Sequence, residues 1–124
     1  MKNMEIIDAN IILRYLLNDH EQLSKRSVSI IENRNIHFPF EVCAEVVYVL
    51  EKVYNVPRKD ITNSLTILLD YSNISTSDSI VLKKALNIYS DKNIDFVDSI
   101  LIAYNHISGI KIHSFDRKIN KLCK

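Results

Sequence analysis

Glycine, proline, cysteine and tryptophan are all scarce in this chain of 124 residues. It has one glycine, two prolines, two cysteines and no tryptophan. Flexible linkers, low-complexity tracts and Gly-rich phosphate-binding loops are therefore excluded. So few turn residues favour a mainly helical protein with a few short strands.

The two cysteines, Cys43 and Cys123, lie in distant parts of the sequence and form neither a CxxC motif nor a zinc-ligand spacing. We therefore expect no disulfide framework, a small core residue at Cys43, and a reducing, cytoplasmic environment.

Neither charge nor hydropathy points to a membrane. The net charge is +1, so contact with a nucleic acid would need a local basic patch. No apolar run approaches the ~20 residues of a membrane span, and the first run is broken at Asp8, which argues against a signal peptide. The length and a hydrophobic fraction of 47% fit a single domain over residues 1–124 with one core.

The order of apolar patterns predicts an α/β fold. Strands are expected over 4–7, 36–38, 73–75 and 110–113. Helices are expected over 10–17, 21–32, 40–54, 57–69, 77–90, 95–107 and 116–122. Strands separated by helices indicate a short parallel sheet of about four strands flanked by helices, and ligands bind such sheets at the carboxyl ends of the strands.

Two carboxylates directly follow predicted strands. Asp8 comes after Ile6 and Ile7, and Asp116 comes shortly after the strand predicted over 110–113. Either aspartate is also a favourable N-cap for the helix that follows it, so the position alone leaves both roles open.

Three more acids lie on predicted helices. Glu45 falls at the edge of the apolar face of the helix over 40–54, where it is a candidate ligand or a boundary residue with its head in water. Asp95 and Asp98 begin a helix that is apolar almost all round. Capping explains Asp95 well, but it explains Asp98 less well because the neighbours of Asp98 one turn on, Leu101 and Ile102, are apolar.

Together these acids predict a cation site. In a parallel sheet their positions converge on one end, and ionised carboxylates that lie close together disfavour one another's ionisation. A hard divalent ion relieves that repulsion, and Mg²⁺ or Mn²⁺ suits oxygen ligands. Such an ion activates water and stabilises the charge of a phosphoryl transition state.

Four segments carry a family resemblance: residues 6–12, 44–50, 95–103 and 114–116. In order and context they resemble the PIN-domain nucleases, and among them the small single-domain toxins of the VapC type. The resemblance implies a PIN-like three-layer α/β/α sandwich that cleaves RNA with Mg²⁺ or Mn²⁺. It also implies the toxin of a type II toxin–antitoxin pair, acting as a homodimer with a small antitoxin protein.

The resemblance also assigns roles to residues. Asp8, Glu45 and Asp98 would be the core metal-binding and catalytic acids, and Asp116 would be the fourth. The supporting residues would be Asp95 as a helper or a cap, with Asn10 and Ser114 orienting carboxylates or water. Ser114 stands where the family often has threonine, and a final edge strand is expected to be short or missing.

Basic residues near these acids are candidates for contact with RNA. Arg117, Lys118 and Lys121 follow Asp116, and Arg14 lies six residues after Asp8. The alternatives are a solvated helix face for the first three and a surface salt bridge for Arg14.

Two other folds with an acid after the first strand fit the sequence less well. A haloacid-dehalogenase-type phosphatase needs a second aspartate where Asn10 stands, and a receiver-like domain needs paired acids after the first strand. A non-catalytic PIN-like RNA- or protein-binding module and a housekeeping RNA-processing nuclease stay open as alternatives.

Overall fold

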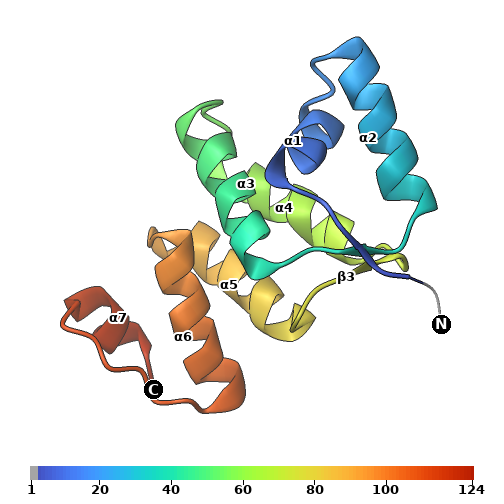
Figure 1. Cartoon of the computed structure of the whole chain (residues 1–124). Helices are drawn as coiled ribbons and strands as arrows, with labels where there is room; N and C mark the ends of the chain where they lie inside the picture. Colours follow the sequence, from blue (N-terminus) through green and yellow to red (C-terminus); the bar gives the residue numbers. More distant parts are fainter. Residues whose placement is uncertain (1–2) are drawn as a thin grey trace. The chain divides into compact units, whose positions relative to one another are not determined.

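A computed structural model describes residues 3–124 of the chain (Figure 1). The chain falls into two compact units, the first ending at Ser77 and the second beginning at Asp78. Each unit is described by itself below, and a single domain over 1–124 stays a prediction from the sequence.

The first unit holds a short parallel sheet and four helices. The strands are β1 (Glu5–Ile6), β2 (Ile36–His37) and β3 (Ile74–Ser75), and the helices are α1 (Ala9–Leu17), α2 (Glu21–Asn33), α3 (Phe40–Lys52) and α4 (Arg58–Leu69). The strand order is β1-β2-β3, with Ile36 opposite both Glu5 and Ile74. The three strands predicted in this part of the chain are confirmed, with shorter bounds.

Apolar side chains from every layer of this unit form its core. Helix α1 packs on α2 and α3, α3 contacts α4, and α4 contacts β3 (Figure 1). The fully buried side chains include Ile12, Ile31, Phe38, Val46 and Leu65. Burying one such side chain stabilises the fold by about 1.5–3 kcal/mol.

The apolar character of residues 4–7 favours a buried first strand, but the structure contradicts this expectation. Strand β1 lies at an edge of the sheet, and Ile6 is 67% exposed. The next residue, Ile7, is only 6% exposed. Because successive side chains of an extended segment point to opposite sides, burial of Ile7 leaves Asp8 at the surface, at the start of α1.

The second unit consists of three helices, α5 (Ser79–Lys92), α6 (Phe96–Ser108) and α7 (Arg117–Leu122). Helices α5 and α6 pack along each other, and α7 contacts α6 (Figure 1). Tyr89 and Phe96 meet edge to face, with ring centroids 5.7 Å apart. Asp78 caps α5 by accepting a hydrogen bond from the Val81 amide at 3.0 Å.

The prediction of a strand over 110–113 is wrong, so the sheet within residues 3–124 has three strands rather than four. This segment has no strand partner in that range, and Ile110 is 50% exposed. The Ile110 carbonyl instead accepts a hydrogen bond from a side chain, Asn105 Nδ2, at 3.0 Å.

Asparagine occupies helix-ending positions that glycine often occupies in other proteins. Asn18 (φ 49°) and Asn93 (φ 51°) end α1 and α5 in the left-handed conformation, and Gly109 (φ 68°) ends α6 in the same way. Asparagine tolerates this conformation better than other side chains do, which lets a chain with one glycine end its helices.

Over residues 3–124, none of the helices combines the length and the apolar character that a membrane crossing needs. The two cysteines are unpaired, and Cys43 is fully buried, as predicted for a core residue. Burial raises the pKa of its thiol.

Candidate active site

Asp8 begins helix α1 and acts as its N-cap. Its Oδ1 accepts a hydrogen bond from the amide of Ile11 at 3.2 Å. The capping alternative is therefore confirmed for this residue. Its other oxygen, Oδ2, accepts no hydrogen bond from the described part of the chain and lies at an exposed position, so capping leaves it available to a ligand.

Glu45 lies on α3 beside the buried face of that helix. The buried residues of α3 are Cys43, Val46, Val47 and Leu50. The helix predicted over 40–54 is shorter in the structure, because α3 ends at Lys52 and Val53 beyond it is 62% exposed. Glu45 itself is exposed, as expected of a residue at the edge of the face.

The first unit brings Asp8 and Glu45 to the wall of one cavity of about 260 Å³. Asn10 and Arg14 line the same cavity, and they lie one helical turn apart on α1. The cavity thus combines two carboxylates, a side-chain amide and a guanidinium group.

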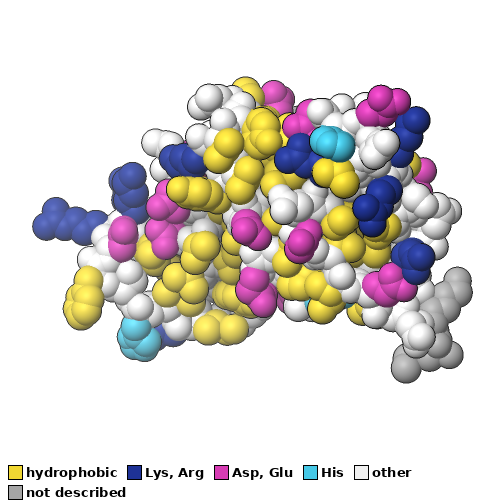
Figure 2. Space-filling model, turned by 45° about the horizontal axis from the view of Figure 1, so that its top comes forward, with side chains coloured by type: hydrophobic (Ala, Val, Ile, Leu, Met, Phe, Trp, Pro, Cys, Tyr) yellow, Lys and Arg dark blue, Asp and Glu magenta, His cyan; other side chains and the backbone are white. Residues whose placement is uncertain are grey.

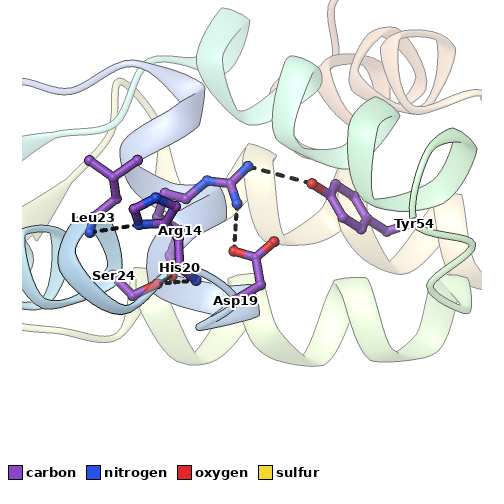
Figure 3. Close-up of polar contacts among 6 residues, drawn as sticks. All are labelled: Arg14, Asp19, His20, Leu23, Ser24 and Tyr54. Atoms are coloured by element: carbon purple, nitrogen blue, oxygen red, sulfur yellow. Dashed lines mark hydrogen bonds and ion pairs between the residues drawn. The ribbon is translucent and has the colours of Figure 1, made fainter.

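Arg14 is held by two side chains, as Figure 3 shows. Its guanidinium forms an ion pair with the Asp19 carboxylate, and Nη2 donates to the Tyr54 hydroxyl at 3.4 Å. The salt-bridge alternative is therefore confirmed. Tyr54 and Asp19 together raise the pKa of Arg14, the Tyr54 hydrogen bond having the larger effect, so the guanidinium stays charged.

The second unit brings three more acids together. Asp95, Asp98 and Asp116 line one cavity of about 350 Å³, together with Arg117 and Lys118. Asp98 is half-buried in the first turn of α6. Burial raises the pKa of Asp98, and the negative charges of Asp95 and Asp116 raise it further.

The predicted cap roles differ within this group. Asp116 does cap α7, since its Oδ1 accepts from the amides of Lys118 at 2.8 Å and Ile119 at 3.3 Å. The Asp116 amide in turn donates to the Ser114 hydroxyl at 2.9 Å, so Ser114 fixes the turn that presents Asp116. Asp95 occupies the N-cap position of α6 but makes no side-chain capping hydrogen bond, so capping does not explain its carboxylate.

Comparison with known proteins shows the family to which the chain is related. The family model described as PIN domain matches residues 6–124. The chain belongs to the PIN domain family. A VapC ribonuclease of Aquifex aeolicus (strain VF5) is 26% identical over 124 residues, which cover 96% of this chain and 92% of that protein. No solved structure matches the chain.

The family match confirms the resemblance predicted from four short segments. The predicted fold class, a PIN-like α/β fold with a short parallel sheet flanked by helices, is confirmed as well, with three strands in place of four. The match begins at Ile6 and runs to Lys124, so it includes all the predicted acids of this PIN domain.

The acids of the PIN domain suit a hard divalent cation by their chemistry. All of them offer carboxylate oxygens. Burial raises the pKa of Asp98 most, and the repulsion from Asp95 and Asp116 that raises it further is one that a cation relieves. Within residues 3–124, histidine, cysteine and acidic side chains form no group of three or more with the geometry of a metal site.

Basic residues of the PIN domain lie partly where the sequence suggested. Arg117 and Lys118 line the cavity of Asp98, whereas Lys121 is exposed on the same short helix. On the face that Figure 2 shows, basic and acidic side chains are interspersed. Because the net charge is only +1, contact with a nucleic acid would depend on local basic residues such as these, which lie beside the acids.

Two residues beside the first cavity were missed by sequence reasoning. Tyr54 lies just past the end of α3 and Asp19 lies in the loop after α1. The hydrogen bond between Arg14 and Tyr54 joins residues 40 positions apart, and no spacing rule connects them.

Proposed function

We propose that this PIN domain is an endoribonuclease that uses Mg²⁺ or Mn²⁺ to hydrolyse RNA phosphodiester bonds. The catalytic and metal-binding residues in this proposal are Asp8, Glu45, Asp98 and Asp116. The observation that carries it is the crowding of Asp95, Asp98 and Asp116 at one cavity, with the raised pKa of Asp98. The similarity to a VapC ribonuclease supports RNA as the substrate.

Each residue has a chemical task in this proposal. When bound, the divalent ion supplies a water of lowered pKa and positive charge near the scissile phosphate. The four carboxylates would hold that ion, and each would have to be ionised to do so. Asp95 adds negative charge beside Asp98.

The supporting residues act on these carboxylates and on the substrate. Ser114 keeps Asp116 in place through the turn described above. Asn10 lines the cavity of Asp8 and Glu45, where its amide orients a carboxylate or a bound water. Arg117, Lys118 and Lys121 contact the RNA backbone, as does Arg14.

The biological role that we propose is the toxin of a type II toxin–antitoxin pair. The protein would act in the cytoplasm on RNA, as a homodimer, and a small antitoxin protein would occlude the acidic site. The similarity to a VapC ribonuclease supports this role. The catalytic proposal does not depend on it, because a housekeeping RNA-processing nuclease would use the same carboxylates.

A cleavage assay on a mixed RNA pool tests the catalytic proposal. The intact protein should cut RNA when Mn²⁺ or Mg²⁺ is present and stop when the ion is chelated. Asp98→Asn should lower the rate by about a hundredfold or more, since metal-site ligands and their close partners carry effects of this order. Asp91→Asn, a change of the same kind on α5, should leave the rate unchanged.

Loss of cleavage by the intact protein under all metal conditions would favour a non-catalytic PIN-like binding module. A separate experiment addresses the toxin role. Induced expression should arrest growth, and Asp98→Asn should abolish the arrest. Rapid growth with an active nuclease would favour a housekeeping RNA-processing role.

A further inference from the structure

The guanidinium of Arg14 is fixed from two directions by side chains that no sequence motif connects. Asp19 follows α1, the helix that carries Arg14, whereas Tyr54 follows α3 (Figure 3). The Arg14 side chain is 24% exposed, so it reaches solvent while both anchors hold it. Arg14 also lines the cavity of Asp8 and Glu45.

Stability does not explain this arrangement well. Ion pairs between partly exposed side chains contribute little to folding, because water screens the attraction and two long side chains must be ordered. The Asp19 side chain is 37% exposed, which places this pair in that class. An arginine ordered at low energetic benefit beside two carboxylates is better explained by a ligand.

The guanidinium keeps hydrogen-bonding capacity for such a ligand. Nη1 donates to Asp19 and Nη2 donates to Tyr54, and the other N–H groups have no partner in the described part of the chain. A planar guanidinium with N–H groups to spare is well matched to a phosphate, which it can contact through paired hydrogen bonds.

The two anchors differ in charge, and this difference sets their roles. The Tyr54 hydroxyl orients the guanidinium without neutralising it. The Asp19 carboxylate neutralises part of its charge and repels an incoming anion. A phosphate would therefore compete with Asp19 but not with Tyr54.

We propose that Arg14 binds a phosphate of the RNA backbone at the Asp8–Glu45 cavity, with Tyr54 as a positioning residue and Asp19 as an internal competitor for the phosphate. This inference rests on the proposed function and deepens it, because it specifies how the substrate backbone is held beside the acids of the first unit. It predicts that the two anchors act in opposite directions.

The test measures RNA binding by the full-length protein in an Asp98→Asn background, so that the RNA stays intact. A fluorescently labelled single-stranded RNA is titrated at several salt concentrations from about 50 to 200 mM. Arg14→Gln should weaken binding about tenfold and reduce the slope of log affinity against log salt by about 0.7, the value for one phosphate contact on a single strand.

The anchor variants give the sharper result. Tyr54→Phe should weaken binding about threefold and Asp19→Asn should strengthen it about threefold, which are effects in the range of single partly exposed interactions. Both effects should vanish when Arg14 is already glutamine. With Asp98 intact, Tyr54→Phe should raise KM for RNA and leave kcat unchanged, a split that general loss of structure would not produce.

Matched controls come from the same unit. Arg58→Gln removes another arginine paired with a carboxylate, that of Glu51 at 3.4 Å, and Tyr48→Phe removes a hydroxyl from an exposed tyrosine of α3. Both should leave affinity and salt slope unchanged.

Three results would overturn the inference: an unchanged salt slope in Arg14→Gln, a Tyr54→Phe effect that persists without Arg14, or weaker binding in Asp19→Asn. Failure of the proposed function would look different. The intact protein would then not cut RNA, while the salt slope would still report whether Arg14 contacts phosphate.

Discussion

At the scale of single residues, Asp98 is a carboxylate whose ionised form is disfavoured by its surroundings. Burial, Asp95 and Asp116 all raise its pKa above the ordinary value of 3.8. The native state therefore holds the Asp98 proton to higher pH than the unfolded state does. The contribution of Asp98 to stability is favourable below pH 3.8 and is lost as pH rises through the raised native pKa.

The raised pKa of Asp98 gives a prediction for the stability of Asp98→Asn in the absence of metal. The free energy of unfolding of the variant should be about 0.5 kcal/mol higher than that of the parent at neutral pH, because the variant removes a charge that burial and two neighbouring carboxylates disfavour and that solvent partly screens. Urea unfolding at a series of pH values measures the difference, which should disappear in acid. A less stable variant at neutral pH would contradict the assignment of repulsion among these three acids.

The acids of the candidate site could be predicted from the sequence because each is marked by its immediate neighbours in the chain. An acid directly after an apolar strand, as at Asp8, or early in an apolar helix, as at Asp98, is visible in a few consecutive residues. The contact of Arg14 with Tyr54 is not, since it depends on how α1 packs against α3. The acids could therefore be predicted from the sequence, whereas the Tyr54 hydroxyl that holds Arg14 could not.

At the scale of elements, the helices were predicted well and the strands less well. Helices such as α3 and α6 follow from apolar residues at a period of about 3.6, a property of one segment alone. A strand needs a partner elsewhere in the chain, so apolar alternation over 110–113 was not sufficient. Asn105 replaces that partner, and nothing in the sequence around it indicates this role.

Asn105 also ties the last residues of the chain to α6. Its Oδ1 accepts from the Lys124 amide at 2.7 Å, and its Nδ2 donates to the Lys124 carbonyl at 3.2 Å. Asn105→Ala should lower the free energy of unfolding by about 2 kcal/mol, because polar groups that it now satisfies lose their partner. Denaturant unfolding measures this loss. Hydrogen exchange should show faster exchange in α7, and unchanged protection there would contradict the proposed tie.

A tyrosine pair connects α1 to the end of α4 in the first unit. The hydroxyls of Tyr15 and Tyr71 are 2.7 Å apart, and their rings meet nearly perpendicular to each other. Burial and then the Tyr71 hydrogen bond raise the pKa of Tyr15 from 10.0 to about 12. The unfolded state thus loses its proton first, and stability falls as pH rises from 10 to 12.

We expect Tyr15→Phe to remove the loss of stability between pH 10 and 12. The variant should be about 1 kcal/mol less stable than the parent at neutral pH, where a hydrogen bond is lost, and the gap should narrow in alkali. Thermal or urea unfolding across this pH range gives the measurement. A parallel decline of parent and variant would show that Tyr15 is not the titrating group.

At the scale of the whole molecule, the proposed catalytic acids are shared between two compact units. Asp8 and Glu45 belong to the first unit, and Asp98 and Asp116 belong to the second. The PIN domain match extends over both, from residue 6 to residue 124. The proposed function therefore requires that changes in either unit have the same consequence for metal binding and catalysis.

Calorimetric titration of the full-length protein with Mn²⁺ tests that requirement most directly. The parent should bind the ion, and Asp8→Asn and Asp98→Asn should each weaken binding by about tenfold or more. Asp60→Asn on α4 and Asp91→Asn on α5 should bind as the parent does. Equal Mn²⁺ affinity in the parent, Asp8→Asn and Asp98→Asn would contradict the account.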